Sequence, residues 1–308
     1  MSSDWEFNDV GDPANAVDSV NGYSGEVLGG ALYTADAGGR SGTAGDYGMD
    51  FGIDSTGQTV RVPDLSFLNG PALFDEVTIS FWQKLDNIAS TSSFWAVSPS
   101  SAAESRGLQA HVPWDTRTIY FDYGGATAPG TRVSQAVPID WDEAEWHHYT
   151  FVKWGNVAEI WIDGVKLVDS AGAGRLATDF TELYLGSAPN GTQSVLGMMD
   201  DFAMFSRALT PEQIGLLAGG ASAIDLVTPP TVVVTEISVN PVNGRASMTW
   251  TSRPGKSYSV FTSTDLTGDP KTEWTELTDG VPSGGETTSF IDALSGGGPV
   301  RFYVVIEN

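Results

Sequence analysis

Residues 146–164 read WHHYTFVKWGNVAEIWIDG, and this stretch decides the fold class. It contains two runs rich in β-branched and aromatic residues, His147–Trp154 and Ala158–Ile162, and such runs are typical of strands. Trp154-Gly155-Asn156 supplies a turn between the two runs, and Asp163-Gly164 is a hairpin signal at the end of the second. The stretch therefore predicts consecutive antiparallel strands.

The same pattern extends in both directions from this stretch. Further strands are expected at Thr59–Val62, Val77–Lys84, Thr118–Asp122, Glu182–Leu185 and Asp201–Phe205, separated by turns rich in Gly, Asn, Asp and Pro. One short helix is predicted from Thr210-Pro211, because Thr is a good N-cap and Pro suits the first helical position. Gly219-Gly220 ends this helix. The pattern predicts an all-β protein.

Composition excludes several classes of protein. The 308 residues hold 39 acidic and 15 basic side chains, and the formal net charge of −24 disfavours nucleic acid as a partner. No apolar run is long enough to cross a membrane, so membrane insertion is not expected. The absence of Cys excludes disulfide frameworks and thiol catalysis. Met1–Trp5 lacks the features of a signal peptide, so a leader is expected to be absent from this chain.

The length predicts two domains. Thr228-Pro229-Pro230 disfavours helix, so we expect a domain at 1–222, a linker at 223–230 and a second domain at 231–308. Six strands are expected in the second domain, at Val232–Val239, Ala246–Thr251, Tyr258–Ser263, Trp274–Leu277, Thr287–Ile291 and Arg301–Ile306. That density of strands predicts a small β-sandwich.

Five short motifs of the first domain follow one another in a recognisable order. They are WHHY (146–149), IWIDG (160–164), LYLG (183–186), GMMDDF (197–202) and SRALT (206–210). Together they resemble the laminin-G-like, or concanavalin A-like, jelly-roll family of secreted bacterial proteins. The stretch from FWQK (81–84) to HVPW (111–114) is similar to one bacterial subgroup. The resemblance implies a jelly-roll sandwich whose usual function is adhesion, glycan binding or spacing.

The second domain resembles a fibronectin type III-like module. The motifs that carry this resemblance are TWT (249–251), YSV (258–260), WTEL (274–277) and FYVV (302–305). The resemblance implies a spacer or an interaction surface. The predicted fold is therefore a concanavalin A-like jelly roll followed by a smaller fibronectin type III-like β-sandwich.

Recognisable catalytic motifs are absent from the sequence. The Glu-x-Asp-x-x-Glu pattern of jelly-roll glucanases, which places two carboxylates on one face, does not occur. The acidic run Asp140–Glu145 precedes a strand and is interpreted as a solvated loop. His147 and His148 are adjacent on a strand, so they point to opposite faces and cannot bind one metal together. The protein is predicted not to be an enzyme, and a polysaccharide-active enzyme with a scattered site stays the third alternative.

Calcium is the cofactor that the sequence favours. Ca²⁺ takes six to eight oxygen ligands, often mixing carboxylates with carbonyls of a loop. In the family that the first domain resembles, a loop near the N-terminus and an Asp of a late strand commonly meet around a structural Ca²⁺. The resemblance places this site at Asp18, Asn21, Asp200 and Asp201. The alternative is that Asp18 is a turn residue and that Asp200 lies at a solvated edge.

Glycan binding is the sharpest functional hypothesis. Sugar sites use an aromatic platform with hydrogen-bonding groups beside it. Trp82, Trp146 and Trp161 lie in strand motifs and are assigned to packing. Residues 111–120 read HVPWDTRTIY, so Trp114 could stack on a sugar that Asp115 or Arg117 contacts, and Tyr120 completes the candidate ligand-binding set. The alternative is that Trp114 caps the sandwich.

The predicted function is a non-catalytic, extracellular or cell-surface protein that presents a calcium-stabilised jelly roll to a glycan or a cell-surface protein. The alternative is a self-assembling structural subunit of a surface layer, appendage or virion. Two sandwiches offer strand edges to which a neighbouring copy can add a strand.

Overall fold

The computed structural model describes residues 2–54, 57–72, 75–101, 105–124, 130–227, 232–252, 256–285, 287–293 and 300–308. The chain divides into two compact units, Met1–Val227 and Thr228–Asn308. In the described part, no helix is long and apolar enough to cross a membrane.

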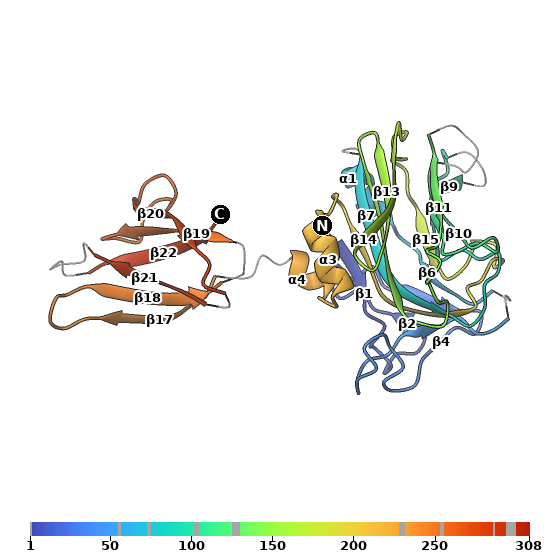
Figure 1. The fold of residues 1–308 in the computed structure, drawn as a ribbon, viewed down its shortest axis with the longest axis horizontal. Helices are drawn as coiled ribbons and strands as arrows, with labels where there is room; N and C mark the ends of the chain where they lie inside the picture. The colour runs from blue at the N-terminus through green and yellow to red at the C-terminus, as the bar shows by residue number, and fades with distance from the viewer. Residues whose placement is uncertain are drawn as a thin grey trace. The chain divides into compact units, whose positions relative to one another are not determined.

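Two antiparallel sheets make up the first unit (Figure 1), and each has eight strands among the described residues. Sheet A, which carries the quoted stretch, runs in the order β14 (Val165–Ala171), β13 (Val157–Ile162), β12 (His147–Trp154), β7 (Glu76–Leu85), β16 (Gly197–Phe205), β5 (Met49–Asp50) and β4 (Leu32–Tyr33), with β1 (Ser2–Trp5) also paired to β16. Sheet B runs in the order β11 (Arg132–Ala136), β10 (Thr118–Tyr123), β9 (Arg106–His111), β8 (Phe94–Val97), β15 (Glu182–Leu185), β6 (Thr59–Val62), β3 (Gly25–Leu28) and β2 (Asn15–Ala16). A short 3-10 turn, η1 (Ser66–Leu68), and helix α1 (Asn69–Ala72) precede β7.

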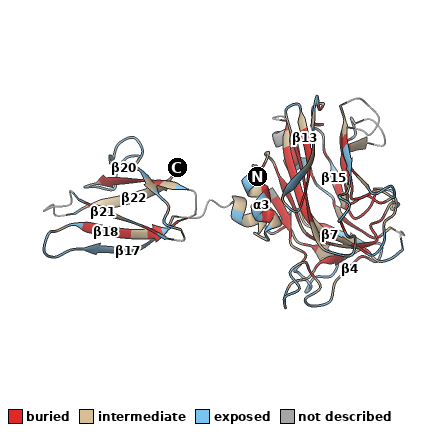
Figure 2. Ribbon diagram, viewed as in Figure 1, coloured by how far each residue is buried: buried red, intermediate tan, exposed pale blue. Residues whose placement is uncertain are grey.

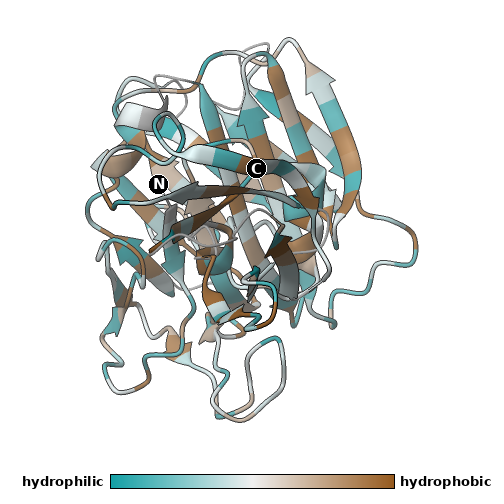
Figure 3. Cartoon of the chain, turned by 90° about the vertical axis from the view of Figure 1, so that its left-hand side faces the viewer, coloured by the Kyte–Doolittle hydropathy of each residue, from teal (hydrophilic) through white to brown (hydrophobic). Residues whose placement is uncertain are grey.

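The core of the first unit is aromatic and lies between the two sheets. Phe81 of β7 stacks on Phe151 of β12 at 6.0 Å and on Phe202 of β16 at 5.6 Å, and it meets Phe94 of sheet B edge-on at 6.1 Å. All four rings are fully buried. Buried positions follow both sheets in Figure 2, and brown and teal bands alternate along several strands in Figure 3. This alternation gives each sheet one apolar face for the core and one face for other uses.

Helix α3 (Pro211–Ala218) covers part of the opposite face of sheet A. Thr210 and Gln213 form a capping box at its start, which confirms the predicted helix. Ile214 and Leu217 of the helix pack on a second apolar cluster that includes Trp161 of β13.

The predicted linker is too long at its N-terminal end. Residues 223–227 form a short helix, α4 (Ala223–Val227), that belongs to the first unit. Ala223 is buried in the cluster beneath α3, and Arg207 donates a hydrogen bond to the carbonyl oxygen of Leu226. These contacts hold the segment on the first unit, whereas residues 228–230 of the predicted linker lie outside the described residues.

The second unit is a small β-sandwich of two three-stranded sheets among its described residues. One sheet runs in the order β17 (Val234–Val239), β18 (Ala246–Thr251) and β21 (Thr287–Asp292), and the other in the order β20 (Thr275–Pro282), β19 (Ser257–Ser263) and β22 (Phe302–Glu307). Met248, Trp250, Tyr258 and Val260 form its buried core. All six predicted strands are therefore present, with ends that differ by a few residues.

Candidate functional site

A row of polar and aromatic side chains crosses sheet B on the face away from the core. Phe94, Ala96 and Leu108 belong to the core, so the alternate positions of β8 and β9 face the other way. The strand registers place Tyr184 beside Trp95, Trp95 beside Gln109, Gln109 beside Asp122, and Asp122 beside Arg132. This face therefore carries residues that are suited to recognition and do not build the core.

A pocket of about 320 Å³ lies at the end of this row, and we call it the Trp114 pocket. Its lining residues are Arg106, His111, Trp114, Tyr120, Arg132 and Gln193. Most come from β9, β10 and β11, and Gln193 comes from the loop between β15 and β16. The pocket therefore brings together two sequence-predicted residues, Trp114 and Tyr120, with four that the sequence analysis did not select.

The turn between β9 and β10 positions Trp114. The Trp114 N–H donates to the carbonyl oxygen of Thr118 at 2.9 Å, and the Arg117 N–H donates to the carbonyl oxygen of Trp114 at 2.8 Å. The half-buried Trp114 ring meets the His111 ring edge-on at 4.4 Å. Gln83 of sheet A donates to the carbonyl oxygen of Val112 at 2.5 Å, which ties the start of this turn to the other sheet.

Asp122 fixes two arginines at the floor of the pocket. Its side chain is fully buried, and its two oxygens accept hydrogen bonds from Arg132 Nε at 2.5 Å and Nη2 at 2.7 Å. Arg106 Nη1 lies 3.5 Å from the same carboxylate. The guanidinium of Arg132 lies over the Tyr120 ring and that of Arg106 over the Trp95 ring, each at 4.6 Å. The hydrogen bonds that Arg132 donates to Asp122 raise the pKa of Arg132, so this arginine stays charged.

His111 presents an uncharged imidazole to the pocket. Its Nδ1 lies 2.6 Å from the carbonyl oxygen of Thr91, which can only accept, so Nδ1 is assigned the proton and Nε2 the lone pair. Burial lowers the pKa of His111 to about 4. At neutral pH, Nε2 is therefore a hydrogen-bond acceptor.

Several buried polar atoms near the pocket lack a hydrogen-bond partner among the described residues. They are Trp95 Nε1, Gln109 Oε1 and Gln193 Oε1. An unsatisfied buried polar atom costs about 1–3 kcal/mol, so a water or a ligand hydroxyl that satisfies it is stabilised there. Gln193 also adopts a left-handed backbone conformation with φ of 58°. Such a conformation is uncommon for a residue other than Gly, and it places an amide side chain in the pocket wall.

The other two predicted ligand-binding residues do not line this pocket. Asp115 accepts a hydrogen bond from the Ser90 hydroxyl at 2.8 Å. Arg117 lies over the Trp141 ring at 5.1 Å and donates to the Trp141 carbonyl oxygen at 3.0 Å. The physical reason is the tight turn, because neighbouring residues of a turn point in different directions and so Trp114 and Arg117 diverge.

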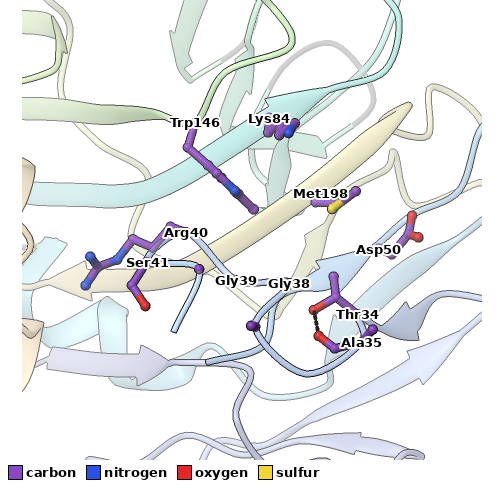
Figure 4. Close-up of a pocket in the computed structure, with 12 residues that line it drawn as sticks. Thr34, Ala35, Gly38, Gly39, Arg40, Ser41, Asp50, Lys84, Trp146 and Met198 are labelled. Atoms are coloured by element: carbon purple, nitrogen blue, oxygen red, sulfur yellow. Dashed lines mark hydrogen bonds between the residues drawn. The ribbon is translucent and has the colours of Figure 1, made fainter. Parts of the chain in front are cut away.

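A second pocket, of about 510 Å³, lies beside sheet A (Figure 4). A glycine-rich loop, residues 34–42, forms one side of it, and Asp50, Lys84, Trp146 and Met198 line the rest. The strand motif assigned Trp146 to packing, whereas the structure shows Trp146 half-buried and in the lining of this pocket. This pocket has one aromatic ring, and its lining includes charges of both signs.

The four residues of the predicted calcium site have other partners. Asp18 accepts hydrogen bonds from the N–H groups of Asp4, Val20, Asn21 and Tyr23, at 2.9–3.3 Å. This is the turn-residue alternative stated for Asp18. Its carboxylate therefore stabilises the loop that was expected to carry the ion.

Asp200 and Asp201 hold Arg40 where a cation was expected. The Arg40 N–H donates to Asp200 Oδ2 at 2.8 Å, and the Arg40 guanidinium pairs with Asp201. Asp200 also accepts from the Asp201 N–H at 2.8 Å. In the described part of the chain, no group of three or more His, Cys, Asp or Glu is arranged to hold a metal ion. With Arg40 in this place the four residues do not fit a calcium ion, and calcium binding stays a prediction from the sequence.

Asp4 is a carboxylate of this cluster that the sequence analysis missed. It is 1% exposed, and neither of its carboxylate oxygens has a hydrogen-bond partner among the described residues. Burial, reinforced by Glu6, Asp201 and Asp18, raises the pKa of Asp4 to about 8. Burial and Asp201 likewise raise the pKa of Asp200 to about 8. The cluster thus favours protonated carboxyl groups near neutral pH.

The two adjacent histidines lie on opposite faces of β12, as predicted. His148 is buried, and its Nε2 lies 2.8 Å from the Ser80 hydroxyl. His147 Nδ1 lies 2.7 Å from Asp163, and its Nε2 lies 3.0 Å from the carbonyl oxygen of Asp142. Both imidazoles are therefore engaged in structural contacts.

Two antiparallel sheets around one aromatic core define the first unit as a jelly-roll β-sandwich, with a pocket on the outer face of one sheet. The laminin G-like profile of the concanavalin A-like lectin/glucanases superfamily matches residues 54–215, and the chain belongs to this family. The adhesion G-protein coupled receptor V1 of Danio rerio is 25% identical over 123 residues. That match covers 39% of this chain and 2% of the receptor, so the chain spans a very small part of this relative.

Solved structures share the fold at low sequence identity. Domain 4 of AbnA, an extracellular arabinanase from Geobacillus stearothermophilus solved with arabinotriose, has a TM-score of 0.50 and 18% identity, and the match covers 70% of this chain and 97% of that domain. The binding domain of botulinum neurotoxin DC, in complex with rat synaptotagmin II, has a TM-score of 0.51 and 13% identity, over 85% of this chain and 66% of that one. At these identities the likeness shows the fold alone. The fibronectin type III-like resemblance of the second unit stays a prediction.

Proposed function

We propose that the first unit is a non-catalytic sugar-binding module and that the Trp114 pocket holds the sugar. The observation that carries this proposal is the meeting of an aromatic ring with polar atoms that have no hydrogen-bond partner among the residues that the structure describes. Trp114 offers an apolar face, while His111 Nε2 and Gln193 Oε1 offer acceptors for hydroxyl groups. Sugars present apolar C–H faces and hydroxyl rims, so they need both kinds of group in one place.

The comparisons support a partner of this kind. AbnA domain 4, which has the same fold, was solved with arabinotriose, and the botulinum binding domain was solved with a protein, rat synaptotagmin II. A glycan, or a cell-surface protein that carries one, is therefore the proposed partner. Such partners are met outside the cell, and we place the protein there or at the cell surface.

Binding without cleavage is supported by the lining of the pocket. Glycoside hydrolysis requires in most enzymes two carboxyl groups about 5–9 Å apart across the scissile bond. The six lining residues, all within the described part, include no Asp or Glu, and the nearby Asp122 is engaged by two arginines. A polysaccharide-active enzyme is the third alternative, and release of reducing ends from a bound glycan would establish it.

Substitution of Trp114 tests the proposal. We expect Trp114→Ala to weaken binding on a glycan array by about tenfold or more, because an aromatic anchor in a pocket contributes about 2 kcal/mol or more. Trp146→Ala is the matched control, because Trp146 lines the other pocket. Equal binding by the natural chain and Trp114→Ala, or no binding by either, would reject this site. Loss of binding in Trp146→Ala alone would move the site to the pocket of Figure 4.

Self-assembly through strand edges is the second candidate function, and strand β17 favours it. This strand lies at the edge of its sheet, and all six of its residues are exposed. Val234, Ile237 and Val239 are 41%, 57% and 64% exposed. An exposed apolar edge is a template for pairing with another strand, and a second copy of this chain is the partner we propose.

A further inference from the structure

We infer that His147 is a pH-operated clamp, whose protonated imidazole fastens the loop between β11 and β12 to the hairpin turn between β13 and β14. We call residues 137–146 the clamped loop. His147 does not line the Trp114 pocket, so this inference is independent of sugar binding. Its content is a charge state of His147 and a movement of the loop that depends on it.

Both ring nitrogens of His147 face groups that can only accept a hydrogen bond. Nδ1 lies 2.7 Å from Asp163 Oδ2, and Nε2 lies 3.0 Å from the carbonyl oxygen of Asp142. Burial opposes ionisation of Asp163, but the hydrogen bonds from His147 and from the His148 N–H, the latter at 2.8 Å, lower its pKa, so this carboxylate is ionised. A neutral imidazole has one N–H and can satisfy only one of the two acceptors. The geometry therefore requires an imidazolium with a proton on each nitrogen.

The immediate contacts of His147 stabilise the charged form. The Trp141 ring stacks on the imidazole at 5.6 Å with an angle of 26° between the planes, and the face of an aromatic ring attracts a cation. Burial opposes the positive charge, but the hydrogen bonds and charges of Asp163 and Asp142 outweigh it and raise the pKa of His147.

Carboxyl groups outnumber cationic groups on the elements packed around His147, which favours a positive charge there. The titratable and charged residues of these elements are Asp140, Asp142, Glu143 and Glu145 of the clamped loop, Asp163 and Lys166 of the β13–β14 hairpin, Arg117 of the β9–β10 turn, and His148 and Tyr149 of β12. Burial lowers the pKa of His148 to about 3 and raises that of Tyr149, so both are uncharged near neutral pH.

Loss of one proton from His147 must break one of its two contacts. The remaining N–H stays with the ionised Asp163, because a hydrogen bond to a charged acceptor is the stronger one. Nε2 then turns a lone pair towards the Asp142 carbonyl oxygen at 3.0 Å, and two acceptors at this distance repel each other. The clamped loop is therefore released from His147 as the pH rises through the pKa of the imidazole.

The clamp spans a pocket of about 290 Å³ that His147 itself lines. The apolar lining comes from the clamped loop and from the β13–β14 hairpin, and consists of Pro138, Trp141, Ile162, Val165 and Leu167. The imidazolium joins these same two elements, through Asp142 of the loop and Asp163 of the hairpin. Protonation thus holds the pocket closed, and release of the loop opens it.

An NMR titration of the natural chain tests the charge state. The chain has three His, and the nitrogen chemical shifts of their side chains can be followed from about pH 5 to about pH 9. We expect the pKa of His147 to lie above the ordinary value of 6.5, with both nitrogens protonated below it. His147→Gln identifies the signal by removing it. A pKa of 6.5 or lower for His147 would overturn the inference.

A pair of aspartate variants tests the cause. Asp163→Asn removes the charge of the acceptor, so we expect the proton-dissociation constant of His147 to rise about tenfold or more. Asp169→Asn is the matched control, because Asp169 lies on the same hairpin and contacts Lys166. Equal constants in the two variants would overturn the role of Asp163. If Asp163→Asn does not fold, the titration of the natural chain still decides.

Amide hydrogen exchange tests the movement of the loop. The Glu145 N–H donates to the Asp142 carbonyl oxygen at 3.2 Å, and the Leu85 N–H of β7 donates to the Glu143 carbonyl oxygen at 2.8 Å, so both amides report docking. After correction for intrinsic rates, protection in the natural chain should fall about tenfold from pH 6 to pH 9 for each tenfold by which the clamp lowers the dissociation constant of His147. In His147→Gln, protection should be lower at pH 6 and fall less. Constant protection in the natural chain, or the same fall in His147→Gln, would overturn the clamp even with a charged imidazole.

Discussion

Asp122 shows how one buried residue can set the chemistry of a surface. Its carboxylate is fully buried on β10, and it holds Arg132 with two hydrogen bonds and Arg106 from the next strand. A buried charge without partners would be costly, so the arginines are required where they are. Their outward-facing edges then become part of the Trp114 pocket.

Asp4 makes stability depend on pH. Its pKa is raised in the folded state to about 8, so the folded protein binds a proton that the unfolded chain has released at neutral pH. Protonated Asp4 therefore favours the folded state fully at low pH, and the free energy of unfolding falls as the pH rises from about 4 to 8. We expect Asp4→Asn to be about 1–3 kcal/mol more stable than the natural chain at pH 8, and to differ less at pH 5.

Thermal melts between pH 6.5 and 8 measure this effect. The buried His111 and His148 have lowered pKa values, so their contribution to the free energy of unfolding rises with pH only below about 6.5. These two residues therefore do not change the stability within the pH range of the melts. Asp200 has a raised pKa as well and remains in the variant. The stability of Asp4→Asn should therefore depend on pH less than that of the natural chain, but it should still depend on pH. The exposed Asp140→Asn is the matched control. A parallel pH profile for Asp4→Asn and the natural chain would contradict this account.

Arg40 decides whether the predicted calcium residues can bind an ion. The guanidinium pairs with Asp201, and the backbone N–H donates to Asp200. Removing the guanidinium frees oxygens beside the unpartnered carboxylate of Asp4, so we expect Arg40→Gln to bind Ca²⁺ more tightly than the natural chain. A site at a hundredfold excess of ion over its Kd adds about 2.7 kcal/mol, which a melt with Ca²⁺ against EDTA detects. Identical midpoints for both proteins, with and without the ion, would remove calcium from this cluster.

At the scale of elements, the turn between β9 and β10 separates the predicted ligand residues. The sequence predicted that Trp114, Asp115 and Arg117 would act together because they are close along the chain. In the turn, Trp114 joins His111 while Arg117 crosses to Trp141. The alternation of side chains along a strand was the available signal for the pocket residues. It places Gln109 and His111 on one face of β9, and Tyr120 and Asp122 on one face of β10. The sequence of β9 or β10 does not indicate which strands pair with it.

The strands that the sequence analysis missed include the two-residue strands and the six-residue strand β9. β2, β4 and β5 have two residues each. β2 and β5 pair with the longer strands β3 and β16, and β4 pairs with β5. β9, RGLQAH, mixes charged and small residues and has weak strand propensity by itself. Its place between β8 and β10 makes it a strand, so the tertiary pairing overrides the local preference.

Strand β17 carries the prediction at this scale. If copies pair along this edge, the natural chain should show a concentration-dependent mass above that of a monomer in size-exclusion chromatography with light scattering. Ile237→Lys should restore the monomer, because a charge on an edge strand opposes strand addition. Ile139→Lys is the control, since Ile139 is fully exposed in the first unit. A monomer at all concentrations for the natural chain would exclude assembly through β17.

For the whole molecule, surface charge and core composition have separate roles. The core of the first unit is built from aromatic and aliphatic residues of both sheets, and the formal charge of −24 is carried by the chain around it. A net charge of this size favours solubility and repels other anions.

The sequence by itself determined the class of fold. Runs of β-branched and aromatic residues, the turns between them and the capping residues are local features, and they predicted an all-β protein, the helix α3 and the six strands of the second unit. The jelly roll was implied by the resemblance of the ordered motifs from residue 146 to 210 to a known family. Such features work because strand and turn preferences depend on neighbours along the chain.

Only the tertiary structure decided the site. Arg132 and Gln193 reach the pocket from β11 and from a distant loop, Arg40 crosses to Asp200 and Asp201, and Asp4 becomes a buried carboxylate through the pairing of β1 with β16. The physical reason is that a site depends on side chains that meet across strands. Those meetings are set by strand order and register, which local sequence does not encode.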